Sequence, residues 1–166
     1  MFTFQIVVDG VTEVLTAISR FGEYAKDLSE PYGEIADDFR DVYMQDVFAS
    51  EGAVNGEAWA PLSPGYAAQK ERAFPGQPLM IRTGDLADSL MGGAGGIRTI
   101  TADTLILGTS ISYAKYHNSD APRKSNLPQR KLIRPPAEVR TRWIKIIQAA
   151  LVKAAREAKL SVSGGS

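Results

Sequence analysis

Residues 97–109 have the sequence Ile-Arg-Thr-Ile-Thr-Ala-Asp-Thr-Leu-Ile-Leu-Gly-Thr, and this stretch decides the fold. It consists of two short runs rich in β-branched and apolar side chains, which are typical of strands. Ala102-Asp103 separates the runs, and aspartate is a turn-forming residue. The pattern therefore predicts a β-hairpin with strands at 97–102 and 104–109. Ser112–His117 is a candidate for a further strand of this sheet.

The segment before the hairpin predicts a strand and two helices. Residues 2–8 alternate with the period of a strand, and Asp9-Gly10 supplies a turn. Apolar residues then recur at three- and four-residue steps over residues 11–28, as on one face of a helix. Ser29 is a candidate N-cap for a second helix over residues 31–47. The face of this second helix opposite its apolar stripe carries five acids: Glu34, Asp37, Asp38, Asp41 and Asp46.

Shorter elements connect this acidic helix to the hairpin. Residues 50–78 are rich in Gly, Pro, Ser and Asn, with a short helix predicted at 66–74. Asp85 is a candidate cap for a brief helix that ends at Leu90. The glycines at 92, 93, 95 and 96 are predicted to form a hinge. They lack the Lys-Ser/Thr pair that a phosphate-binding loop requires.

The part after the hairpin predicts a loop and a long helix. Residues 121–134 are basic and contain proline, which favours an extended loop. Pro135-Pro136 then precedes a helix whose apolar positions share one face from Val139 to Ala154.

The order of predicted elements, β-α-α-loop-α-β-β-β-α, indicates the α+β class. We expect a small antiparallel β-sheet packed by helices, with a long extended arm and a long C-terminal helix. The length of 166 residues fits a single domain over residues 1–166. Within it, residues 50–96 are predicted to form the extended arm and loop insertion, and residues 161–166 a C-terminal tail.

The composition excludes several classes of function. The chain has no Cys and one His, which excludes a disulfide framework, a thiolate metal site, a cysteine nucleophile and a His-rich zinc site. No apolar run approaches the roughly 18 residues that span a bilayer. Residues 1–10 lack the basic start of a signal peptide. We therefore expect a soluble protein made in a cytosol, without a cofactor, a metal or a membrane partner.

The balance of 19 basic and 19 acidic residues hides a split between the two parts of the chain. Residues 1–60 carry a net charge of −9, and residues 61–166 carry +9. The acids lie chiefly on the second predicted helix, and the bases lie in the loop at 121–134 and on the last helix. Such asymmetry is typical of a chain that contacts a charged partner.

The stretch Trp59-Ala60-Pro61-Leu62-Ser63-Pro64 combines a large aromatic side chain with two prolines. The prolines restrict the chain and so reduce the entropic cost of docking it. One interpretation is that Trp59 fills the core of its own domain. The other is a stiff arm that inserts Trp59 into a neighbouring subunit, where such side chains are energetic hot spots.

Two further clusters have a local and an assembly interpretation. Arg82 begins a turn that leads into a helix, and its planar guanidinium also suits a carboxylate pair between subunits. His117 lies with Tyr113 and Tyr116 and is the only histidine that could act as a general base. No Gly-x-Ser-x-Gly element accompanies it, so a structural histidine at an interface is favoured. We assign no catalytic, cofactor-binding or metal-binding residues and expect no enzymatic activity.

The basic loop leaves a nucleic-acid alternative open. Basic clusters bind nucleic acids without sequence preference by releasing counterions. No Phe, Tyr or Trp lies between His117 and Trp143, which argues against base stacking in this loop. A nucleic-acid-binding module in the basic C-terminal half therefore competes with pairing to an acidic protein face.

Four short elements follow one another within residues 48–155. They are Gly56–Pro64 with Tyr66 and Lys70, Arg82–Leu86 with Ser89-Leu90, Tyr113–His117, and Leu127–Leu132. Together they resemble the signature of the bacteriophage virion morphogenesis proteins, which are tail-completion and neck proteins of tailed phages. The chain departs from this signature in two places, because it has no aromatic residue near Leu132 and no glycine after His117.

The resemblance implies a small α+β subunit that forms a ring, with a hexamer as the expected assembly. The ring would lie at the head–tail junction or, as a tail terminator, at the upper end of the tail tube. The implied partners are copies of the same chain, the tail tube protein and the head–tail connector or adaptor proteins, with DNA passing through the channel without sequence-specific binding. The implied location is the virion. On this basis we expect these residues at subunit interfaces: Trp59, Pro61, Leu62, Arg82, Tyr113, Tyr116, His117, Arg130 and Leu132.

The charge split then suggests self-recognition. Acidic helices and a basic loop with its helix are candidates for complementary faces of one repeated subunit.

Overall fold

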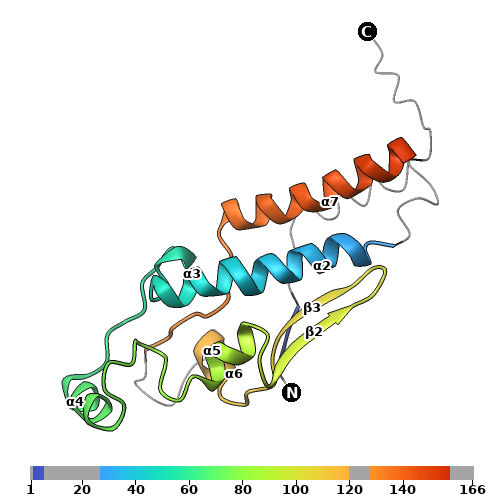
Figure 1. The fold of residues 1–166 in the computed structure, drawn as a ribbon. Helices are drawn as coiled ribbons and strands as arrows, with labels where there is room; N and C mark the ends of the chain where they lie inside the picture. Colours follow the sequence, from blue (N-terminus) through green and yellow to red (C-terminus); the bar gives the residue numbers. More distant parts are fainter. Residues whose placement is uncertain (1, 6–26, 120–127, 158–166) are drawn as a thin grey trace.

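The structure is a computed structural model that describes residues 2–5, 27–119 and 128–157 (Figure 1). Its elements are β1 (Phe2–Gln5), α2 (Ser29–Asp38), the π-helical turn η2 (Phe39–Tyr43), α3 (Met44–Ala49), the 3₁₀ turn η3 (Ala53–Asn55), α4 (Pro64–Ala73), α5 (Asp85–Leu90), β2 (Gly96–Ile100), β3 (Leu105–Thr109), α6 (Ala114–Asn118) and α7 (Ala137–Glu157). The fold is α+β, as predicted. Most of the helix predicted over residues 11–28, and the tail at 161–166, lie outside the described residues.

The predicted hairpin is confirmed as β2 and β3. The described sheet has the order β1-β3-β2 with both pairings antiparallel, and Ile100 lies opposite Leu105. The strands are shorter than predicted because Asp103 organises a four-residue turn. Its carboxylate accepts hydrogen bonds from the hydroxyls of Thr101 (2.8 Å) and Thr104 (3.0 Å). These bonds hold the pKa of the Asp103 carboxyl below its usual value.

The prediction of a further strand at Ser112–His117 is wrong, because this segment forms α6. The Thr109 hydroxyl accepts the backbone N–H of Ile111 (3.0 Å), and the Ala114 N–H then bonds back to the carbonyl of Ile111 (3.1 Å). These local bonds turn the chain out of the sheet. Tyr113 and Tyr116 follow the alternation of a strand only in part, and they end on the surface of a short helix.

The second predicted helix is confirmed as a continuous run of α2, η2 and α3. In η2 the backbone N–H of Met44 bonds to the carbonyl of Phe39, five residues earlier, which widens the helix locally. Tyr43 is completely buried there, and its ring meets that of Trp143 edge-on at 5.8 Å. Trp143 lies on α7, the predicted C-terminal helix. Figure 1 shows α2 between α7 on one side and the β2–β3 hairpin on the other, so the core lies along α2.

Two details of this helix differ from the sequence prediction. Ser29 is not the N-cap, because Leu28 occupies that position and Ser29 is the first residue of the helix. The backbone N–H of Ser29 donates to Asp27 Oδ1 (2.8 Å). This bonding lowers the pKa of Asp27. Asp38 does not lie on a solvated face, because Trp143 Nε1 and Arg142 Nη2 donate to its Oδ2 at 2.6 and 2.8 Å. One predicted acid of the outer face therefore joins α2 to α7.

Helix α4 projects from the body at the lower left of Figure 1. All of its described side chains are exposed except that of Lys70. The ends of the predicted 50–96 arm, in contrast, belong to the body, since Trp59 and Leu86 are buried in the core. Arg130 holds Ala60 and Pro61 on the body, and Leu79, Met80 and Ile81 pack against the core. The projecting arm therefore comprises residues 62–78.

Candidate assembly surfaces

A group of polar side chains, which we call the clamp, holds the chain at residues 131–134. The Tyr43 hydroxyl donates to Asn55 Oδ1 (2.5 Å) and accepts the backbone N–H of Arg134 (2.9 Å). Asn55 Nδ2 donates to the carbonyls of Lys131 (3.1 Å) and Leu132 (3.2 Å). Burial raises the pKa of the Tyr43 hydroxyl well above its usual value, so it stays protonated as a donor.

Asn118 completes the clamp from the other side. Its Oδ1 accepts the backbone N–H groups of Leu132 (3.1 Å) and Ile133 (3.0 Å). This segment makes no strand pairing in the described structure, so side chains satisfy its backbone groups instead. The sequence analysis did not identify Asn55 or Asn118. Asn118 directly follows the Tyr113–His117 element, and Asn55 directly precedes Gly56, so both adjoin motifs that were recognised.

Trp59 lies in the core of its own chain. Its side chain is 6% exposed, its ring meets Phe48 edge-on at 5.5 Å, and its Nε1 donates to the carbonyl of Lys131 (2.9 Å). Gly52 makes this packing possible, because a Cβ there would overlap the indole, and its φ of 85° suits glycine. In the described chain the local interpretation of Trp59 therefore holds.

Arg130 and Leu132 also lie inside the subunit. Arg130 is 7% exposed, and its Nε and Nη2 donate to the carbonyls of Ala60 (2.8 Å) and Pro61 (3.1 Å). Leu132 is completely buried. These contacts join the Gly56–Pro64 element to the Leu127–Leu132 element across about seventy residues of sequence. The structure thus brings three of the four sequence elements to one place.

The fourth element, at Arg82–Leu86, lies at the junction of the arm and α5. Arg82 is exposed, with its guanidinium 5.7 Å from the centre of the Phe74 ring. Gly84 rather than Asp85 occupies the N-cap position of α5, with a φ of 94°. The carboxylate of Asp85 accepts the Thr83 hydroxyl (2.7 Å) at the start of the helix. The turn agrees with the sequence analysis, whereas the prediction that Asp85 caps the helix is wrong.

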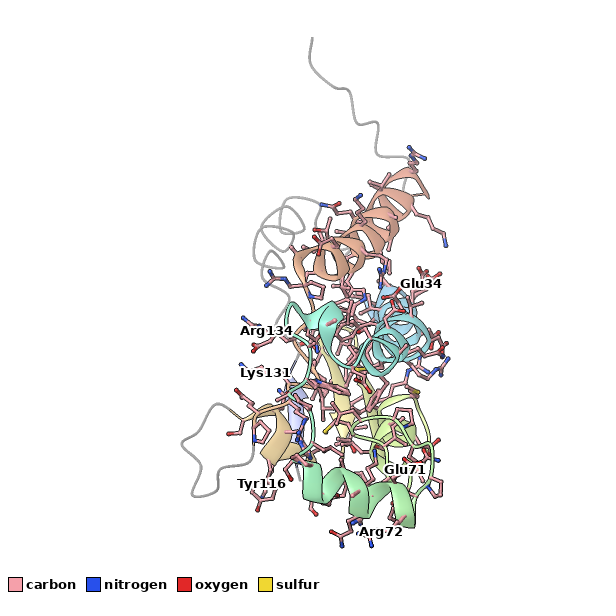
Figure 2. All side chains as sticks on the ribbon, turned by 90° about the vertical axis from the view of Figure 1, so that its left-hand side faces the viewer. Glu34, Glu71, Arg72, Tyr116, Lys131 and Arg134 are labelled. Carbon is pink, nitrogen blue, oxygen red and sulfur yellow. The ribbon has the colours of Figure 1, made fainter. Side chains whose placement is uncertain are left out.

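Helix α6 carries an exposed surface that we call the α6 knob, formed by Tyr113, Lys115 and Tyr116. The two tyrosines are 43% and 62% exposed. Lys115 Nζ lies 5.1 Å from the centre of the Tyr116 ring, and Tyr113 meets the His117 ring edge-on at 6.4 Å. Figure 2 shows Tyr116 on the same side of the molecule as Lys131 and Arg134. This side therefore combines exposed aromatic rings with positive charge.

The remaining interface candidates lie between these surfaces. Pro61 is exposed, and Leu62 and His117 are half-buried. None of the three is held in the core.

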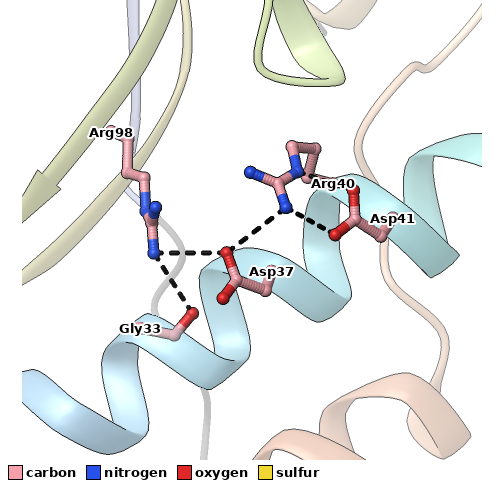
Figure 3. Close-up of polar contacts among 5 residues, drawn as sticks. All are labelled: Gly33, Asp37, Arg40, Asp41 and Arg98. Atoms are coloured by element: carbon pink, nitrogen blue, oxygen red, sulfur yellow. Dashed lines mark hydrogen bonds and ion pairs between the residues drawn. The ribbon is translucent and has the colours of Figure 1, made fainter.

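The acidic side of α2 is partly neutralised within the subunit (Figure 3). Asp37 lies 3.2 Å from Arg98 and 3.6 Å from Arg40, and Arg40 also makes a two-point contact with Asp41. Hydrogen bonding from Arg40 lowers the pKa of Asp41. Some of the acids in the first part of the chain therefore pair with bases of the second part within the molecule, as Asp37 of α2 does with Arg98 of β2. Glu34 lies on the opposite side of the molecule from Lys131 and Arg134 in Figure 2.

The described residues contain no group of His, Cys, Asp and Glu side chains that could hold a metal ion. Across the same ranges, no helix has both the length and the apolar character needed to cross a bilayer.

These features define a small α+β protein with a projecting arm and with exposed charged and aromatic side chains. The chain belongs to the phage virion morphogenesis family, whose model matches residues 8–151. Neither the comparison with curated proteins nor that with solved structures gives a match. Family membership gives the chain a structural or assembly role in making a bacteriophage virion, in a family that is not known to be enzymatic.

Proposed function

We propose that this protein forms a closed ring at the head–tail junction or at the upper end of the tail tube of a phage. The observation that carries the proposal is the arm at residues 62–78, which is ordered although every side chain of its helix α4 except Lys70 is exposed. A helix that is exposed on nearly all faces needs a source of stability other than packing on the core.

Internal polar contacts supply that order. Lys70 donates through Nζ to the carbonyls of Gln77 (3.0 Å) and Pro78, and it is the one buried residue of α4. Glu71 accepts the backbone N–H of Gly76 (3.2 Å). Burial lowers the pKa of Lys70. The arm is thus pre-organised, which reduces the entropic cost of binding a neighbour.

An arm of this kind suits a ring of small subunits. A stable interface buries more than about 1,000 Å² in total, and a projecting element adds area that a compact subunit lacks. A head-to-tail contact that closes on itself gives a ring. In this proposal the ring, expected to be a hexamer, contacts the tail tube protein and the connector or adaptor proteins, and DNA passes through its channel without sequence-specific binding.

The test is the mass of the purified chain in solution, measured by light scattering and native mass spectrometry. We expect a single closed oligomer for the wild type. Replacing residues 64–76 with a short Gly-Ser linker should leave the far-UV circular dichroism of the body intact and give monomers. A wild-type chain that stays monomeric at high concentration and is missing from purified particles would contradict the proposal.

The α6 knob favours a second candidate function, which is binding of nucleic acid. The exposed tyrosines beside Lys115, on the side of the molecule that also carries Arg134, offer stacking surfaces together with positive charge. This candidate requires retention of DNA at about 50 mM salt and a steep loss of affinity as salt rises. Failure of the protein to bind duplex or single-stranded DNA at this salt concentration would contradict this second candidate function.

A further inference from the structure

A shallow groove of about 230 Å³ lies between the N-terminal part of α2 and the C-terminal half of α7. Ile146 and Leu151 of α7, both half-buried, contribute apolar surface to it. Lys153 also lines the groove and lies 3.5 Å from Glu30. The acids that line the groove outnumber this single base, and they are Asp27, Glu30 and Glu34. An occupant that combines an apolar group with positive charge therefore complements the groove.

The α6 knob has this combination. Tyr116 is the most exposed of the large hydrophobic residues in the described part of the chain. Tyrosine offers a large apolar ring at low entropic cost, and for this reason it is enriched among interface hot spots. Lys115 places its ammonium group beside that ring. Tyr66 on α4 is less suitable, because the nearby Lys70 already donates to backbone carbonyls of the arm.

The positions of groove and knob exclude contact within one described chain and indicate how two copies meet. Figure 2 shows Glu34, at the groove, and Tyr116, on the knob, on opposite sides of the molecule. Complementary surfaces on opposite sides of a subunit give a head-to-tail contact, and repetition of such a contact gives a ring when the rotation between neighbours closes. An isologous dimer would instead bring one patch against itself.

We infer that the groove between α2 and α7 binds the α6 knob of a second copy of this chain. Tyr116 of one copy packs on Ile146 and Leu151 of the next, and Lys115 faces the carboxylates of Glu30 and Glu34. This inference rests on the proposed ring, since it names the two surfaces that neighbouring subunits bring together.

Cross-linking tests the contact directly, because the chain contains no cysteine. We would introduce Tyr116→Cys on the knob and Ala150→Cys in the groove, in separate chains, and treat them with a short bismaleimide. Each variant alone should give no cross-link, and an equal mixture should give dimers only. The chain with both substitutions should give a ladder that ends at the closed ring. Gln69→Cys on α4 is the matched control, and its mixture with Ala150→Cys should give at least tenfold less dimer.

Charge reversal tests the electrostatic part. Lys115→Glu and Glu34→Lys should each shift the assembly to monomers, with at least a tenfold loss of affinity, whereas Lys115→Arg should assemble normally. An equal mixture of the two reversed chains should recover rings, because every contact in an alternating ring again joins opposite charges. Recovery by mixing is not expected from variants that simply misfold.

The outcomes separate this inference from the proposed function. A wild-type chain that never forms rings contradicts the proposed function itself. Wild-type rings that give no dimer in the cysteine mixture, and that tolerate both charge reversals, overturn the knob-and-groove contact alone. A cross-link formed by Tyr116→Cys chains with one another would also overturn it, since it would show an isologous contact. Retention of DNA that Lys115→Glu abolishes, with assembly unchanged, would assign the knob to nucleic acid instead.

Discussion

At the residue scale, a few small and polar side chains decide how the recognised sequence elements come together. Gly52 gives room to the Trp59 indole, and Asn55 bonds to backbone carbonyls 76 and 77 residues away in sequence. Arg130 ties the same region to residues 60 and 61. The packing of the body next to the arm therefore depends on one close packing contact and a few hydrogen bonds that lie near one another.

We expect Gly52→Ala to destabilise the fold by about 2–4 kcal/mol. A Cβ at this position would overlap the Trp59 ring, and the positive φ adds strain. Gly56→Ala is the matched control, because its φ is also positive but nothing lies within 4 Å of the added Cβ. The control should cost about 1 kcal/mol. Urea denaturation followed by tryptophan fluorescence measures both, and equal losses for the two variants would contradict the role given to Gly52.

Asn55→Ala should cost about 2–3 kcal/mol, since it removes the side-chain donor to the Leu132 carbonyl and the acceptor of the Tyr43 hydroxyl, whereas the Lys131 carbonyl keeps the Trp59 Nε1 donor. Gln69→Ala on the exposed face of α4 should change stability by less than about 0.5 kcal/mol. The free energies of unfolding from chemical denaturation compare the two. If Asn55→Ala lowers the free energy of unfolding no more than Gln69→Ala does, solvent replaces the hydrogen bonds of Asn55 in the clamp.

At the element scale, the contact between α2 and α7 organises the molecule. The widened turn η2 places Tyr43 against Trp143, and Asp38 accepts hydrogen bonds from Trp143 and Arg142 across the same contact. Tyr43 also belongs to the clamp, so the helix pair and the 131–134 segment share one side chain. A substitution that removes this contact should therefore destabilise the 131–134 segment as well as the packing of the two helices.

Asp38→Ala should destabilise the protein by about 2–3 kcal/mol, because a buried indole N–H loses its acceptor and Arg142 its carboxylate. Glu34→Ala, one turn earlier on α2, should cost less than about 0.5 kcal/mol. Thermal unfolding by circular dichroism compares the pair. Similar melting temperatures for the two variants would show that Asp38 is only a surface acid.

The elements that the sequence predicted are those with strong local patterns. The hairpin, the helix through residues 31–47 and the helix after Pro135-Pro136 follow from periodicity and turn residues within each segment. α6 was missed because its geometry depends on the bond from Ile111 to the Thr109 hydroxyl, which periodicity does not encode. The clamp was missed for a similar reason, since Asn55 and Asn118 meet the 131–134 segment only after the chain has folded.

At the scale of the whole molecule, charged side chains form ion pairs that stabilise the fold, and in our proposal other charged side chains act in assembly. Part of the acid on α2 pairs with Arg40, Arg98 and Arg142 inside the subunit. Glu34 and Tyr116 of the α6 knob are exposed and lie on opposite sides of the molecule in Figure 2. The charge split of the sequence therefore serves the fold first, and the proposed self-recognition uses only part of it.

Assembly should weaken as salt rises, because exposed charges are screened over a Debye length that falls to about 3 Å at 1 M salt. We expect the midpoint concentration for ring formation to rise at least several-fold between about 50 mM and 500 mM sodium chloride. Sedimentation velocity over a concentration series measures it. A midpoint that does not change with salt would remove electrostatic complementarity from the account.

The most direct test of the central claim is a cryo-electron microscopy reconstruction of the phage particle that contains this chain. The account predicts a closed ring of this subunit between the head and the tail tube, with the 62–78 arm of each copy lying on its neighbour. A particle without the chain, or one that holds it as isolated copies away from this axis, would contradict the account.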